Sequence, residues 1–186
     1  WYIQQTRGGK LSDRAVIMLH PYNSNKANCL PMARALWENG YSVFMFDFRS
    51  FAEVPTKQSV GYYEQRDALA AIRYVRESLE PNIATRLGLF GASMGGAVAI
   101  LVSHGEDAEK VDAVVTDCAF ASLRGVVRHG MRFKFPYMPE SLLRFSESCA
   151  ENFNAFWFGY SLDDVDPAAA VGSTAAGETK LGLGVS

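Results

Sequence analysis

Short apolar runs alternate with helix-like stretches along most of this chain. Four of these runs, rich in branched or aromatic residues, have the length of strands: 15–19 (AVIML), 41–48 (YSVFMFDF), 86–90 (RLGLF) and 111–117 (VDAVVTD). The second run places apolar residues on both of its faces, which is typical of a parallel strand covered on two sides. We therefore expect four strands of one buried sheet.

Amphipathic stretches separate these runs and predict helices over 26–39, 61–81 and 93–104. The clearest is 61–81, where apolar residues recur on one face and Pro81 supplies a stop signal. Strand–helix alternation at this spacing produces right-handed βαβ units. The predicted fold class is therefore α/β, a three-layer α/β/α arrangement around a mostly parallel sheet.

The pattern changes after Phe120. Residues 121–160 hold many aromatic side chains but no clear strand. We expect helices here, which form either a cap or lid over the carboxyl edge of the sheet or ordinary core that faces the sheet. From Pro167 onward the chain has no aromatic residue and little to bury, so we expect it to be frayed or disordered. The predicted domain is 1–171, with a disordered tail at 172–186.

Composition excludes several classes of protein. The chain has 186 residues, is 48% hydrophobic and 20% charged, and carries a net charge of −2. These values fit one soluble globular domain without the basic stripe of a nucleic-acid binder, so we expect no nucleic-acid partner. Its three cysteines lie far apart and form no C-x-x-C pair, which argues against a disulfide framework or a zinc site and favours a reducing compartment.

No apolar run is long enough to cross a bilayer, so we expect no membrane segment in this chain and a cytoplasmic location. The chain begins at Trp1 rather than at Met, and an upstream signal or anchor segment is compatible with that beginning.

One serine stands out chemically. The stretch Gly91-Ala92-Ser93-Met94-Gly95 matches G-x-S-x-G and lies between a predicted strand and a predicted helix. In that context the turn strains the serine, and the residues two positions away must lack side chains. The hydroxyl then stands at the carboxyl end of the strand, above the positive end of the helix. Ser93 is therefore a candidate nucleophile; the alternative is a glycine-rich turn with an incidental serine.

Several segments resemble the α/β-hydrolase fold family, in particular bacterial serine esterases and serine-aminopeptidase-like hydrolases. The resemblance covers 1–171 and is carried by VIMLHPYNSN, FMFDFRSF, GYYEQRD, FGASMGGAVA and VTDCAFASL. It implies that Ser93 attacks the acyl carbon of a carboxylic ester, or less readily of a peptide-like amide, and forms an acyl-enzyme. The implied partner is a small-molecule acyl substrate, with no cofactor and no metal.

The resemblance also implies an oxyanion hole. The backbone N–H of Met94, directly after the nucleophile, is one expected donor. The second should come from the loop after His20, where Pro21 has no N–H, so the N–H of Tyr22 is the better candidate. His20 precedes Ser93, against the family order of serine, acid and histidine, and we expect it to order that loop.

The base and the acid of a serine hydrolase are harder to find. In the family they follow two later strands, and this chain reads GSTAAGETKLGLGVS where the first of those strands should begin. We therefore expect a sheet that lacks its last strands, through truncation at the C-terminus. An internal pair, Asp117 as acid and His129 as base, has the right order; otherwise Asp117 structures a loop and His129 lies on the surface. The alternative function is a truncated or non-catalytic protein that at most binds a ligand.

Overall fold

A computed structural model describes residues 1–7, 10–49, 59–79, 86–105 and 111–175. Its main sheet has the strand order β1-β5-β4-β6-β7, and all strands except β1 run parallel to their neighbours. The strands are β1 (Tyr2–Ile3), β4 (Arg14–Leu19), β5 (Ser42–Met45), β6 (Arg86–Ala92) and β7 (Ala113–Asp117). A small hairpin pairs β2 (Thr6–Arg7) with β3 (Lys10–Leu11). The prediction of a mostly parallel α/β sheet is confirmed.

The helices follow the strands as the periodicity predicts, although their ends differ. A 3-10 turn at Lys26–Cys29 leads into α1, a π turn at Val75–Leu79 ends α2, and a 3-10 turn at Leu162–Asp164 precedes α6. The helices are α1 (Leu30–Glu38), α2 (Glu64–Tyr74), α3 (Met94–Ser103), α4 (Leu123–Lys134), α5 (Glu140–Phe158) and α6 (Pro167–Ala175). Among the described residues, no helix combines the length and the apolar character that crossing a membrane would need.

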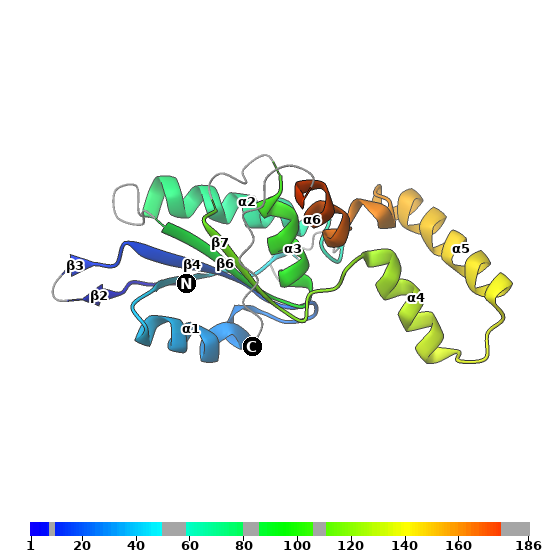
Figure 1. Cartoon of the computed structure of the whole chain (residues 1–186), viewed down its shortest axis with the longest axis horizontal. Coiled ribbons are helices and arrows are strands. Elements are labelled where there is room, and N and C mark those ends of the chain that lie inside the picture. The colour runs from blue at the N-terminus through cyan, green and yellow to red at the C-terminus, as the bar shows by residue number, and fades with distance from the viewer. Residues whose placement is uncertain (8–9, 50–58, 80–85, 106–110, 176–186) are drawn as a thin grey trace.

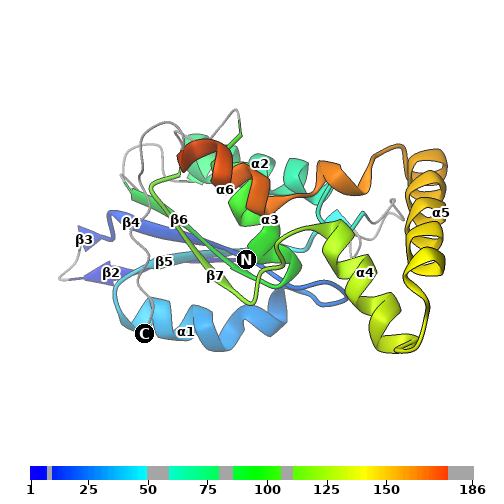
Figure 2. The ribbon, with the colours of Figure 1, turned by 45° about the vertical axis from the view of Figure 1, so that its right-hand side comes forward.

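Helices cover both faces of the sheet: α1 lies on one face, and α2, α3 and α6 lie on the other (Figures 1 and 2). The burial of strand β4 explains why its residues 15–19 are all apolar. Its residues Ile17 and Leu19 pack into the core beneath α2 and α3, whereas Val16 and Met18 pack into the core above α1. Both faces of this strand are therefore buried, as parallel strands in three-layer folds require.

The sheet stops at β7 within the part of the chain that the structure describes. This strand pairs with β6 on one side only, and the side chain of Val115 is 57% exposed. Within the described residues, β7 is therefore an edge strand of the main sheet.

One prediction was wrong. The chain is not frayed from Pro167 onward, because residues 167–175 form α6. Pro167 fits the first turn of a helix, and the carboxylate of Asp166 accepts a hydrogen bond from the N–H of Ala169 at 2.8 Å. The N–H of Ala168 also donates to the carbonyl of Ala121, at 3.0 Å. The rest of the predicted tail, 176–186, lies outside the described residues.

Helices α4 and α5 form a hairpin (residues 123–158) that extends away from the body of the molecule (Figures 1 and 2). The prediction of helices after Phe120 is thus confirmed. Seven aromatic side chains in or beside this hairpin are exposed, among them Phe133 (85%), Tyr137 (97%) and Phe156 (83%). The interpretation as core is wrong for these seven side chains, whereas Tyr160 is buried in a core cluster against which Phe158 packs.

Candidate active site

Ser93 occupies the corner between β6 and α3, and its backbone is strained. Its φ of 51° and ψ of −115° lie in a region that side-chain-bearing residues rarely adopt. The carbonyl of Ser93 accepts the N–H of Ala97 at 3.0 Å, which begins the helical hydrogen bonding of α3. The serine therefore sits at the N-terminus of a helix and at the carboxyl end of a strand.

Glycines allow this corner to form because backbone atoms fill the space around it. A Cβ on Gly91 would lie 2.3 Å from the carbonyl oxygen of Gly95, and a Cβ on Gly95 would lie 2.2 Å from that of Leu19. A Cβ on Gly96 would lie 2.9 Å from the carbonyl oxygen of Gly91. These contacts are closer than real Cβ atoms tolerate, so the three glycines are sterically required.

The same contacts bring the loop after β4 to the N-terminus of α3. A Cβ on Gly95 would also lie 2.8 Å from the carbonyl oxygen of His20, at the start of the loop that contains Tyr22. Tyr22 is 49% exposed, and Asn23 next to it turns the chain with a φ of 52°. Met94, the first residue of α3, is buried, and its N–H precedes the first intrahelical hydrogen bond.

His20 is buried beside this loop and is held by two hydrogen bonds. Its Nε2 accepts the backbone N–H of Phe48 at 3.0 Å, so its Nδ1 carries the proton and donates to the carbonyl of Pro21 at 2.8 Å. Burial lowers the pKa of His20 below its ordinary value, which keeps the ring neutral. Its contacts are those of a residue that orders the loop.

The backbone of Asp117 lies next to the backbone of Ser93. The two strands place Ala92 opposite Asp117, and the N–H of Ser93 donates to the carbonyl of Asp117 at 2.8 Å. The Asp117 side chain is exposed. A hydrogen bond to this carboxylate, together with its charge, raises the pKa of the neighbouring Cys118 thiol, which disfavours a reactive thiolate there.

The other two histidines form no hydrogen bond with Ser93 in the part of the chain that the structure describes. His104 caps the far end of α3, where its Nδ1 lies 2.8 Å from the carbonyl oxygen of Ile100. His129 is exposed on α4, in the hairpin. Within the described ranges, no hydrogen bond joins an imidazole to Ser93 or to Asp117. The structure thus places the predicted Ser93, Met94 and Asp117 at one edge of the sheet, and His129 on a separate element.

A buried carboxylate, that of Glu64 in the segment GYYEQRD, fixes the start of α2. Glu64 is fully buried and accepts hydrogen bonds from the hydroxyl of Ser59 (2.5 Å) and the N–H groups of Ser59 (3.2 Å) and Gly61 (2.8 Å). The hydroxyl of Tyr160 donates to the carbonyl of Ser59 at 2.6 Å, and burial raises the pKa of Tyr160 to about 12. The signal in the sequence was a glutamate three residues after a glycine, directly before an apolar helix.

Two ion pairs tie residues after β5 to the helices. The side chain of Arg49 donates three hydrogen bonds to the carboxylate of Asp67 in α2, the shortest at 2.7 Å, and the side chain of Lys26 pairs with Asp47. No group of three potential metal-ligating side chains occurs in the part of the chain that the structure describes.

A model of the alpha/beta hydrolase fold matches residues 14–166, which is most of the chain. The chain belongs to the alpha/beta hydrolase fold family. The strand–turn–helix corner at Ser93 lies in the middle of the matched region.

Two bacterial proteins are similar to this chain in sequence. The uncharacterized protein YfhR of Escherichia coli O157:H7 is 34% identical over 126 residues, which cover 66% of this chain and 43% of YfhR. The uncharacterized protein YqkD of Bacillus subtilis is 24% identical over 157 residues, 84% of this chain and 50% of YqkD. This chain therefore spans about half the length of these curated relatives.

Among solved structures, the Pyrococcus furiosus esterase Pf2001 is similar, with a TM-score of 0.59 and 28% identity over 80% of this chain and 62% of the esterase.

Proposed function

We propose that Ser93 is the nucleophile of a serine hydrolase that acts on carboxylic esters and, less readily, on peptide-like amides. The observation that carries this proposal is a strained serine, with φ at 51°, held between glycines that cannot be replaced without backbone clashes. Strain of this kind costs about 1–3 kcal/mol and persists where a side chain must be presented. The likeness to the esterase Pf2001 supports esters as the substrate class.

In the proposed reaction, the Ser93 hydroxyl oxygen attacks the carbonyl carbon of the ester while a general base takes the hydroxyl proton. The tetrahedral intermediate collapses, the bond to the alcohol oxygen breaks, and the alcohol leaves with that proton. Water then attacks the acyl-enzyme with the help of the same base, and the carboxylic acid is released. No cofactor takes part in these steps.

The backbone supplies the proposed oxyanion hole. The N–H of Met94 stands at the N-terminus of α3, where it has no partner within the helix and where the helix dipole favours negative charge. The N–H of Tyr22 is the proposed second donor, since its loop abuts the same helix end. Each such donor contributes about 3 kcal/mol of transition-state stabilisation.

We propose that the general base lies outside the region in which this chain matches its relatives. None of the three histidines of this chain hydrogen-bonds to Ser93 within the described ranges, and His20 is kept neutral by its burial, with both ring nitrogens engaged in other hydrogen bonds. The backbone of Asp117 lies beside the corner, whereas His129 belongs to the projecting hairpin. We therefore propose that residues beyond this chain's match to its relatives provide the histidine.

Because no hydrogen bond joins Ser93 to an imidazole of the described residues, we also propose a second candidate function, a non-catalytic protein of this fold that binds an acyl ligand without cleaving it. The two candidates make different predictions about turnover, because binding requires no general base, whereas turnover does.

The test compares the 186-residue chain with the longest product of the same locus, using hydrolysis of p-nitrophenyl butyrate. We expect the longer product to turn over, Ser93→Ala to abolish turnover, and Ser103→Ala to retain it. Ser103 is a matched control because it lies at the other end of α3, where its hydroxyl donates to the carbonyl of Ile100. If the 186-residue chain turns over the ester and His129→Ala abolishes that turnover, the internal pair of Asp117 and His129 is active instead. If neither product turns over the ester, the result favours the non-catalytic binding protein.

A further inference from the structure

A strained turn at residues 59–61 precedes α2. Val60 has a φ of 50°, in the left-handed region that a β-branched residue rarely adopts, and Gly61 follows with a φ of 111°. Strain of this kind persists only where the surrounding structure holds the backbone in place. Contacts on either side of Val60 must therefore hold this turn.

The carboxylate of Glu64 binds both neighbours of Val60. One of its oxygens accepts the N–H of Ser59 at 3.2 Å. The other accepts the hydroxyl of Ser59 at 2.5 Å and the N–H of Gly61 at 2.8 Å. Glu64 is fully buried, and hydrogen bonds are stronger there than in water. Because one side chain binds the residues before and after Val60, loss of its charge would release the turn.

The same turn holds the root of the α4–α5 hairpin. The hydroxyl of Tyr160, two residues after α5, donates to the carbonyl of Ser59 at 2.6 Å. The ring of Tyr160 is stacked on that of Tyr62, with the ring centres 4.5 Å apart. The hydroxyl of Tyr63 donates to the carbonyl of Phe158, the last residue of α5, at 2.7 Å. The end of the hairpin is thus attached to the turn and to the residues that follow it.

The turn also contacts α3, the helix that follows the nucleophile corner. A Cβ on Gly61 would lie 3.1 Å from Cγ1 of Val165, just beyond the hairpin, and 3.7 Å from Cγ2 of Val98 in α3. Val60 packs against the core cluster that contains Val98 and also against the cluster that contains Val165. The turn therefore lies between α3 and the root of the hairpin, and its conformation sets how the two are placed.

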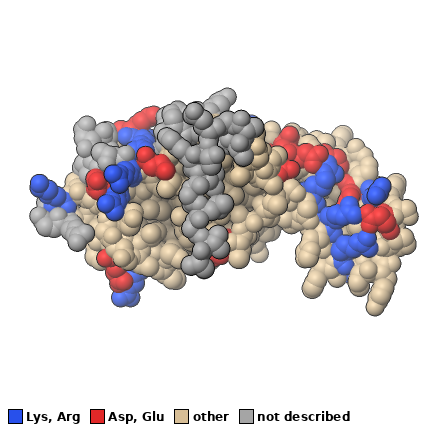
Figure 3. All heavy atoms as spheres, in the orientation of Figure 1, with Lys and Arg blue, Asp and Glu red and all other residues tan. Residues whose placement is uncertain are grey.

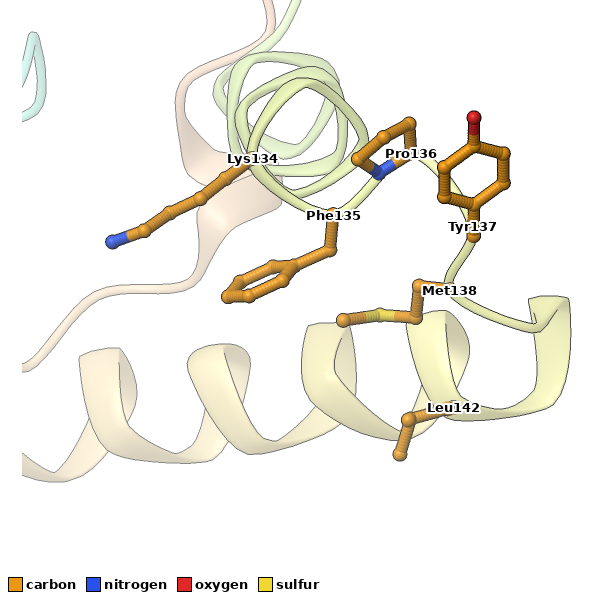
Figure 4. Close-up of a pocket in the computed structure, with 6 residues that line it drawn as sticks. All are labelled: Lys134, Phe135, Pro136, Tyr137, Met138 and Leu142. Atoms are coloured by element: carbon orange, nitrogen blue, oxygen red, sulfur yellow. The ribbon is translucent and has the colours of Figure 1, made fainter.

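Beyond this root, contacts between its own helices hold the hairpin together. Arg124 of α4 pairs with Glu151 of α5 at 3.0 Å. Arg128 pairs with Glu147 at 3.1 Å, and Figure 3 shows Lys and Arg side chains beside Asp and Glu side chains on the hairpin. A pocket of about 370 Å³ lies at the tip, between the end of α4 and the start of α5 (Figure 4). The ion pairs make the two helices one unit, whose orientation is determined at the root.

We propose that Glu64 is a positioning residue that fixes the α4–α5 hairpin in one orientation relative to the Ser93 corner. Its carboxylate holds the strained turn at Val60, and the turn joins α3 to Tyr160. Without the carboxylate, Val60 relaxes to a negative φ, and the carbonyl of Ser59 turns away from Tyr160. The hairpin then adopts other orientations. This inference concerns the orientation of the hairpin and does not depend on the proposed hydrolysis.

Two native cysteines allow this orientation to be measured in the 186-residue chain. Cys118 follows β7 and Cys149 lies in α5, and both are exposed, whereas Cys29 is buried. Burial raises the pKa of the Cys29 thiol to about 11, which disfavours its labelling. Double electron–electron resonance between nitroxides on Cys118 and Cys149 should give one narrow distance distribution. In Glu64→Gln the distribution should widen at least about twofold, because an amide offers one acceptor oxygen in place of two.

A second variant and a matched control accompany this substitution. Tyr160→Phe keeps the ring that stacks on Tyr62 but removes the hydroxyl that binds Ser59, and it should also widen the distribution. Glu38→Gln makes the same chemical change in an exposed ion pair with Arg34 on α1, and it should leave the distribution unchanged.

Substitutions at Val60 separate positioning from a general loss of stability. When added to Glu64→Gln, Val60→Gly should restore the narrow distribution, because glycine adopts a positive φ without a carboxylate to hold it. Val60→Ala, which keeps the Cβ, should not restore it. A broad distribution in the original chain, an unchanged one in folded Glu64→Gln, or equal effects of Val60→Gly and Val60→Ala would each overturn the proposal. If Glu64→Gln does not fold, Tyr160→Phe decides, and an unchanged distribution in that variant overturns the proposal.

Discussion

The Ser93 corner and the α4–α5 hairpin differ in what surrounds their side chains. At the corner, backbone atoms of β4, β6 and α3 approach so closely that three glycines are required. On the hairpin, a Cβ added to Gly130 would have no neighbour within 4 Å, and large aromatic rings face outward. The first region is determined by contacts within the chain, whereas the second presents a surface that those contacts leave uncovered.

The largest difference between the two regions should appear at their glycines. Gly95→Ala should lower the free energy of unfolding by at least about 3 kcal/mol, because its methyl group would meet the carbonyl of Leu19. Gly130→Ala, in the open part of α4, should instead raise it by about 0.5–1 kcal/mol through helix propensity. Urea denaturation measures both, and equal effects of the two substitutions would contradict the contrast.

A second pair of substitutions compares buried with exposed residues within the hairpin. Leu143 is fully buried, so Leu143→Ala should lower the free energy of unfolding by about 2–3 kcal/mol. Phe156 is 83% exposed, so Phe156→Ala should change it by less than about 0.5 kcal/mol. A large loss on removing Phe156 would show that this ring packs within the chain after all.

The buried His20 should make stability depend on pH. Its pKa is lowered in the folded state, so the unfolded chain takes up a proton at a higher pH than the folded chain does. The contribution of His20 to the free energy of unfolding is fully present above the ordinary histidine pKa of about 6.5. It is lost as the pH falls below that value toward the pKa of His20 in the folded state.

His20→Ala should remove that part of the pH dependence in urea titrations and lower the free energy of unfolding at neutral pH by at least about 1–3 kcal/mol, since the N–H of Phe48 loses its acceptor. An unchanged pH profile would contradict the role assigned to the buried ring.

The smallest predicted effect concerns the strain at Ser93 itself. Ser93→Gly should raise the free energy of unfolding by about 1 kcal/mol, because glycine adopts a positive φ without steric cost. Ser93→Ala, which keeps the Cβ, should leave stability nearly unchanged and serves as the control. A Ser93→Gly variant less stable than Ser93→Ala would argue against strain at the corner.

The parallel sheet and the Ser93 corner could be predicted from the sequence, because each depends on residues that lie close together along the chain. Strand β4 is buried on both faces, and the run AVIML reflects that burial directly. The G-x-S-x-G spacing likewise follows from a steric requirement, because backbone atoms crowd the positions of Gly91 and Gly95.

Other features depend on contacts that periodicity does not encode. The pairing of β1 with β5 joins residues about forty positions apart through strands of two to four residues, too short to show a pattern. Helix α6 has a low apolar content that predicts disorder, and it forms because Asp166 caps its first turn and Ala168 hydrogen-bonds to Ala121. The sequence of α5 predicts an ordinary amphipathic helix. The ion pairs with α4 show that α4 covers the polar face of α5 and leaves its apolar face exposed.

The central claim, that Ser93 is a nucleophile, is tested most directly by a fluorophosphonate probe on the longest product of this locus, with the adduct mapped by mass spectrometry. We predict a single adduct on the peptide that contains Ser93, absent from Ser93→Ala and retained in Ser103→Ala. An adduct on another residue, or equal labelling of Ser93→Ala, would contradict the claim.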